Sequence, residues 1–149
     1  MKRMASLLSF LLLVVLVGYV TMSMVALAAP TLPNDVQMIE PDSSLPKELR
    51  NFWGKWTGMQ IVQALYEVFI IVEKIDKDRA SLYFWSTDTP KWTRINANVM
   101  QDGNQYSIQF ISGGTGRKNT LSLKKDGSME YFYSDVSSGN NIIVLNKVP

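Results

Sequence analysis

From Phe52 to the C-terminus, apolar and polar residues alternate in short runs separated by Asp, Gly, Asn and Ser. Alternation with a period of two places successive side chains on opposite faces of a β-strand, and tight turns between such runs are typical of antiparallel hairpins. A short helix is the alternative only at residues 61–67. About eight strands are expected, at residues 53–60, 68–75, 79–86, 93–100, 105–111, 119–124, 129–135 and 141–148.

The Asp102-Gly103 pair predicts the register of one hairpin. A two-residue type I′ turn at this pair would gather six apolar side chains on one face and leave polar residues on the other. A slip of one residue would pair apolar with polar residues throughout. The expected cross-strand pairs are Met100 with Gln105, Val99 with Tyr106, Ala97 with Ile108, and Ile95 with Phe110.

The Asp126-Gly127 pair predicts a longer loop. A two-residue loop here would set Leu123 opposite Glu130, whereas a three-residue loop at 125–127 with a left-handed glycine keeps apolar residues together. The expected pairs are Leu123 with Met129, Leu121 with Tyr131, and Asn119 with Tyr133. Asn119 then faces inward and needs a polar partner or a water molecule.

A stretch of two tryptophans and two glycines opens the first strand, in the order Phe52-Trp-Gly-Lys-Trp-Thr-Gly58. Gly54, Trp56 and Gly58 share one face, which suits a sharply curved strand whose indole fills the end of a barrel. About eight antiparallel strands could form a sandwich or a closed barrel, and closure removes both exposed edges. We therefore expect an all-β, up-and-down β-barrel.

The same stretch resembles the Gly-x-Trp motif on the first strand of the calycins, the group that holds lipocalins, fatty-acid-binding proteins and avidins. The resemblance implies a lipocalin-like barrel, with a lead-in turn at residues 44–50 that covers one end. It also implies that a basic residue near the last strand lies over the tryptophan. Lys147 matches that residue, where arginine is usual, and would form a cation-π contact with Trp56.

The N-terminus has the features of a secretory signal peptide. Lys2 and Arg3 precede an apolar run, and small residues around Ala28 form an A-x-A cleavage pattern. The expected organisation is a signal peptide at 1–28, a Pro-rich flexible linker at 29–46 and the barrel domain at 47–149. The mature protein would be secreted or periplasmic, without membrane association after cleavage. An uncleaved anchor over residues 5–29 is the alternative.

Charge and composition exclude several classes of function. Removal of residues 1–28 takes away two of the 15 basic residues and none of the 13 acidic residues, so the mature chain is formally neutral and unsuited to nucleic acid. Without cysteine the fold has no disulfides, and without histidine the usual catalytic triads and zinc sites lack members. No catalytic residue, cofactor or metal is therefore expected.

Two further motifs give only weak signals of chemistry. Glu67 and Glu73 could pair as in a glycosidase, although charges on the solvent face of a sheet are far more common. Residues 112–118 are glycine-rich but lack the spacing and the Gly-Lys pair of a phosphate-binding loop. A flexible connection between strands is the expected role of that segment.

The expected ligand site lies at one end of the barrel, in the stretch Trp85-Ser-Thr-Asp-Thr-Pro-Lys-Trp92. Aromatic rings with a few polar groups suit a small molecule, although packing of both rings on the barrel rim is slightly favoured because exposed tryptophans are costly. We expect a small apolar or amphipathic ligand. The alternative is a structural or protein-interaction domain of the cell envelope with a filled barrel. The candidate ligand-binding residues are Trp85, Asp88, Trp92, Tyr106 and Tyr131, and the candidate residues for barrel closure are Gly54, Trp56, Gly58 and Lys147.

Overall fold

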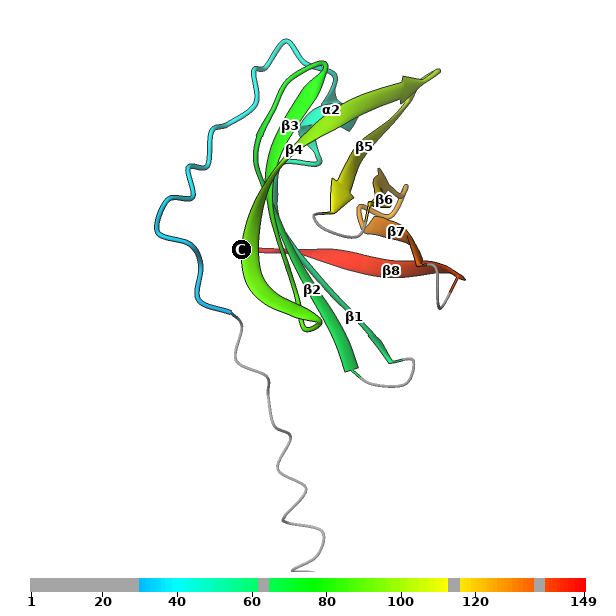
Figure 1. Cartoon of the computed structure of the whole chain (residues 1–149). Coiled ribbons are helices and arrows are strands. Elements are labelled where there is room, and N and C mark those ends of the chain that lie inside the picture. Colours follow the sequence, from blue (N-terminus) through cyan, green and yellow to red (C-terminus); the bar gives the residue numbers. More distant parts are fainter. Residues whose placement is uncertain (1–29, 62–64, 113–115, 136–138) are drawn as a thin grey trace, which may run out of the picture. The chain divides into compact units, whose positions relative to one another are not determined.

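The computed structural model describes residues 30–61, 65–112, 116–135 and 139–149, and residues from Leu32 onward form one compact unit (Figure 1). This unit is a closed, eight-stranded, antiparallel up-and-down β-barrel, in which each strand pairs with the next and β1 pairs with β8. The predicted fold class and all eight strands are therefore confirmed. The strands are β1 Gly54–Ile61, β2 Leu65–Ile75, β3 Arg79–Ser86, β4 Thr89–Asp102, β5 Gln105–Ser112, β6 Arg117–Leu123, β7 Met129–Asp135 and β8 Gly139–Val148.

The two predicted hairpin registers have different outcomes. Between β6 and β7, Leu123 pairs with Met129 and Leu121 with Tyr131, as predicted, and Gly127 has a φ of 86°. Between β4 and β5 the predicted pairing register was wrong by two residues. Asp102 pairs with Gln105, and the turn is Gly103-Asn104 instead of Asp102-Gly103. Glycine at the first central position, with a φ of 58°, suits a type II′ turn.

That error leaves the predicted faces of β4 and β5 unchanged. A shift of two residues returns every side chain to the same side of a strand, since the side-chain period is two. Ala97, Ile108 and Phe110 are buried in the interior of the barrel, and Ile95, Val99 and Tyr106 pack against them.

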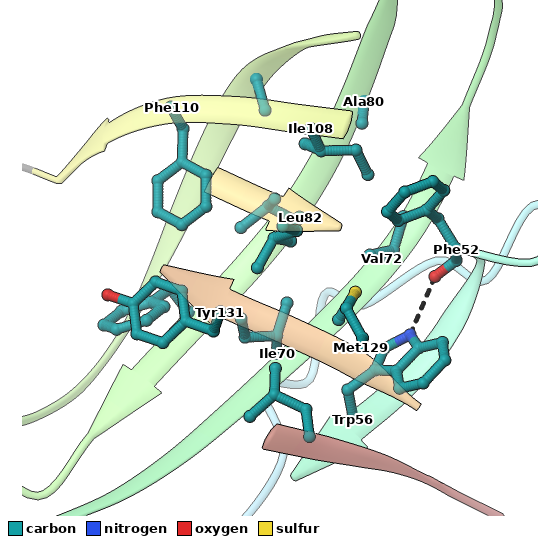
Figure 2. Close-up of a cluster of buried hydrophobic side chains, with 14 of the residues drawn as sticks. Phe52, Trp56, Ile70, Val72, Ala80, Leu82, Ile108, Phe110, Met129 and Tyr131 are labelled. Atoms are coloured by element: carbon teal, nitrogen blue, oxygen red, sulfur yellow. Dashed lines mark hydrogen bonds between the residues drawn. The ribbon is translucent and has the colours of Figure 1, made fainter. Parts of the chain in front are cut away.

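The end of the barrel before β1 is closed by apolar side chains. The helical turn α2, Lys47–Arg50, lies within the predicted lead-in turn, and both Leu49 and Phe52 are buried. The indole Nε1 of Trp56 donates a 2.8 Å hydrogen bond to the carbonyl oxygen of Phe52 (Figure 2). Lys147 Nζ lies 5.3 Å from the centre of the Trp56 ring, so the expected cation-π contact is present. We call this the closed end.

Gly58 allows the first and last strands to approach closely. A Cβ at Gly58 would lie 2.4 Å from the carbonyl oxygen of Val144 and 2.6 Å from Leu145 Cδ2. The junction of β1 and β8 is also short. Three residue pairs, from Lys55–Val148 to Thr57–Asn146, join the two strands, whereas every other junction has five to eight.

Residues 35–39, which we call the strap, lie against the outer face of β2 and β4 and form no helix or strand. Ile39 N donates to Glu73 O over 2.8 Å, and Gln37 N donates to Glu73 Oε2 over 3.3 Å. Asp35 lies 3.8 Å from Arg94 Nη1. The prediction of a flexible linker at 29–46 did not include these bonds to the barrel.

Glu73 is the extra residue of a β-bulge in β2 and is almost fully buried. Its Oε1 accepts hydrogen bonds from Ser81 Oγ at 2.7 Å and from Arg94 Nη2 at 2.6 Å. Burial raises the pKa of Glu73, but the hydrogen bonds from Ser81, Arg94 and Gln37 outweigh burial and hold the pKa below its ordinary value. Glu73 therefore stays charged and joins the strap to the barrel.

Candidate functional site

The end opposite α2 carries polar side chains on the inner face of the barrel, and we call it the polar end. The hairpins β1–β2, β3–β4, β5–β6 and β7–β8 all turn there, because successive turns of an up-and-down barrel alternate between its two ends. Strand alternation points these side chains inward, on the faces that carry the core residues of each strand. They include Gln60, Tyr66, Ser86, Arg117, Asn119 and Tyr133.

Aromatic rings connect this polar layer, through Tyr66 and Tyr133, with the apolar core. The rings of Phe84 and Tyr131 have centroids 5.7 Å apart, those of Tyr131 and Tyr133 are 5.2 Å apart, and those of Tyr66 and Tyr133 are 5.8 Å apart. Phe110 stacks on Tyr131 at 6.4 Å (Figure 2). We call these rings the aromatic floor, because they fill the interior next to the inward polar side chains.

Buried hydrogen bonds fix the polar groups next to this floor. Tyr131 Oη donates to Asn119 Oδ1 over 2.8 Å, and Asn119 Nδ2 donates to the Arg117 carbonyl oxygen over 2.9 Å. Asn119 thus has the polar partner that its inward position requires. Its amide orients the Tyr131 hydroxyl at the wall of the barrel.

Tyr66 and Tyr131 stay neutral at physiological pH. Burial raises the pKa of Tyr131, and the neighbouring Tyr66 and Tyr133 raise it further, while Arg117 opposes the rise. Burial also raises the pKa of Tyr66, although a hydrogen bond with Ser86 and the charge of Arg117 act in the opposite direction. Both hydroxyls remain protonated, so they can donate as well as accept a hydrogen bond.

Gln60 has an unused hydrogen-bonding group in this layer. Its Oε1 is buried and has no hydrogen-bond partner within the part of the chain that the structure describes. A buried acceptor without a partner costs about 1–3 kcal/mol, so such groups in native proteins call for an explanation. A donor on a bound molecule would satisfy this oxygen.

The five predicted ligand-binding residues do not form one site. Trp85 and Trp92 lie on the outer face, where their rings pack edge-on against Phe69 and Tyr83 respectively. Asp88 lies in the exposed β3–β4 turn. Tyr106 and Tyr131 face the interior, but Tyr106 follows the β4–β5 hairpin at the closed end.

The outward position of Trp85 has a simple physical cause. Phe84 is the inward residue of β3, so its neighbour Trp85 must point outward, and the indole finds an aromatic partner there. The ligand-site prediction rested on residue type, and packing of both rings on the barrel was the alternative. The same alternation, extended to the strand ends, would have identified Gln60, Tyr66 and Arg117 as inward residues.

Glu67 and Glu73 cannot act as a glycosidase pair. They are six residues apart on one strand, roughly 20 Å at about 3.3 Å per residue, and such a pair needs a spacing of about 5–10 Å. Glu73 is also engaged by Ser81 and Arg94.

An open depression of about 430 Å³ lies beside the β2–β3 hairpin, and charged and polar side chains such as Lys74, Asp76 and Arg79 line it. Among the described residues, no three His, Cys, Asp or Glu side chains gather closely enough to hold a metal ion. No helix in the described ranges is both long and apolar enough to cross a membrane.

Comparison with known proteins identifies no family for this chain. No protein-family model, no curated protein and no solved structure matches the chain.

Proposed function

We propose that this chain is an exported, calycin-like barrel that binds a small amphipathic molecule at the polar end. The closed barrel and the contact between Trp56 and Lys147 support the calycin-like class. The basic, apolar and small-residue regions of residues 1–28 support export. The protein acts by binding, without catalysis, metal or cofactor.

One observation carries the proposal, namely the layer of inward polar groups above an aromatic floor. The floor of Tyr66, Tyr131 and Tyr133 offers flat apolar surface to the hydrocarbon or aromatic part of a ligand. Gln60 Oε1 and Arg117 lie in the layer that a polar head group would reach. Arginine favours an anionic head group, because a charge-assisted hydrogen bond is about twice as strong as a neutral one.

The test is calorimetric titration of the compact unit Leu32–Pro149 with fatty acids, retinoids and aromatic carboxylic acids. We expect at least one of these to bind, and Arg117→Gln to weaken it at least tenfold. The matched control is Arg79→Gln, which removes an exposed arginine on the outer face of β3, away from the polar end, and should leave the affinity unchanged. Absence of binding by every compound, or equal affinity in both variants, would overturn the proposal.

A second candidate function follows from the same aromatic floor. Phe84, Phe110 and Tyr131 occupy the middle of the interior, as expected of a filled barrel that serves as a structural or interaction domain. Such a domain would act through its outer surface. A panel without any binding compound favours this second function.

A further inference from the structure

Five exposed apolar side chains form one patch on the outer face of β8, β1 and β2, at the polar end. Their exposed fractions lie between 40% for Leu65 and 79% for Ile61. Ile61 pairs with Leu65 across β1 and β2. The β1–β8 pairing ends at Thr57 and Asn146, and the same register extended toward the polar end would set Met59 beside Val144 and Ile61 beside Ile142. The patch consists of Met59, Ile61, Leu65, Ile142 and Val144.

Charged residues flank this patch but do not enter it. Two acidic residues lie on the neighbouring strands at the edges of the patch. Glu67 on β2 pairs with Met59, and Glu130 on β7 pairs with Val144. The next row toward the polar end continues from Ile142 to the half-buried Phe132 without a charge. An uncharged apolar centre with a polar rim is the usual anatomy of a protein-protein interface.

We propose that two copies of this chain associate reversibly through the patch. The five side chains expose roughly 500 Å² of apolar surface, at the upper end of what a monomer normally leaves bare. A standard interface covers about 800 Å² per partner, so the patch supplies its centre and neighbouring residues such as Thr57 and Asn146 supply its rim.

The pattern of the patch favours a second copy as the partner. Apolar residues of β1, β2 and β8 make up its centre, and the row of Ile61, Leu65 and Ile142 carries no charge that would face a like charge across a two-fold axis. A two-fold interface requires one surface that fits itself, and the outer faces of two sheets pack well at about 10 Å. The carboxylate of Glu67 disfavours the negatively charged surface of an anionic membrane, whereas Glu130 is paired with Lys124 over 3.2 Å.

The test compares the oligomeric state of three proteins by sedimentation velocity over a range of concentrations. We expect Leu32–Pro149 to form dimers as its concentration rises, and Ile61→Lys to raise the dimer dissociation constant at least tenfold. Met100→Lys is the matched control, since Met100 is also an exposed apolar residue but lies by the β4–β5 turn at the closed end. Circular dichroism checks that each variant is folded.

Cysteine cross-linking locates the interface, because the chain contains no cysteine of its own. Met59→Cys should give a covalent dimer with a short bifunctional thiol reagent, and Asn96→Cys, exposed on the outer face of β4, should not. A monomer at every concentration, or a dimer that Ile61→Lys leaves intact, would overturn the proposal. A monomer that binds phosphatidylcholine vesicles through the patch would assign the surface to lipid instead.

Discussion

Glu73 connects more parts of the molecule than its single position in β2 suggests. Its carboxylate accepts hydrogen bonds from β3, β4 and the strap, while its carbonyl oxygen accepts from Ile39 N and from Trp53 Nε1. A buried carboxylate is tolerated only when donors surround it. The bulge at Glu73 turns both its carboxylate and its carbonyl oxygen toward these donors.

We predict that Glu73→Gln lowers the free energy of unfolding by about 2 kcal/mol at neutral pH, through loss of charge-assisted hydrogen bonds. A fully buried ion pair would cost about 3–5 kcal/mol, but water can solvate the half-exposed Arg94 in the variant. Urea unfolding measures the difference. Glu40→Gln, at an exposed position of the chain, is the control and should have no effect.

The difference in free energy of unfolding between wild type and Glu73→Gln has a defined pH dependence. The folded pKa of Glu73 lies below its ordinary value of 4.5, so the stability it adds is present above pH 4.5 and is lost as the pH falls below that value. The gap between wild type and Glu73→Gln should therefore be constant at neutral pH and narrow on acidification. A gap that widens below pH 4.5 would contradict the proposed charge state.

Among the elements, the strap is the one that sequence patterns could not reveal. It has no alternation and no helical period, because it bonds to the barrel through single backbone groups at Gln37 and Ile39. The strands, by contrast, were predictable because every second side chain must enter a common core. The site was only partly predictable, since Tyr131 faces it while the two tryptophans of the expected site lie outside.

The β4–β5 hairpin shows what local sequence leaves undetermined. Both Asp102-Gly103 and Gly103-Asn104 are favourable turn pairs, and the two registers differ by an even number of residues. Burial of apolar faces therefore cannot distinguish them, whereas at the β6–β7 hairpin the competing two-residue loop would have paired Leu123 with Glu130. There the apolar pairing of Leu123 with Met129 was decisive.

We predict that Ile39→Pro loosens the strap and costs about 1 kcal/mol, because proline has no N–H to donate to the Glu73 carbonyl oxygen. The cost stays small since Trp53 Nε1 still donates to that oxygen. Ile39→Ala shortens the side chain similarly and keeps the N–H, so the difference between the two variants in thermal unfolding reports the hydrogen bond. Equal melting temperatures for the two variants would show that the bond contributes nothing.

At the scale of the whole molecule, the junction of β1 and β8 is the least extensive one in the barrel. Three pairs join these strands near the closed end, while β1 and β2 share eight. Local opening follows the density of hydrogen bonds and contacts, so the barrel should open first along this junction.

We predict a matching gradient in amide hydrogen exchange. Amides in the second half of β1 that point toward β8 should exchange faster than amides at the centre of β2 and β3, where pairing is continuous from Val68 to Val72. Exchange followed by NMR measures each amide separately. Uniform protection around the barrel would contradict a weak junction.

The pairing of Lys55 with Val148 also constrains the order in which the protein folds, since roughly 90 residues lie between the partners. Closing so large a loop has a high entropic cost, and the contact becomes favourable only after the intervening hairpins have formed. Folding is therefore slow. A nascent polypeptide emerging from the ribosome therefore keeps two unpaired strand edges until β8 has been synthesised. Stop codons that remove β8 should yield aggregation rather than a smaller native protein.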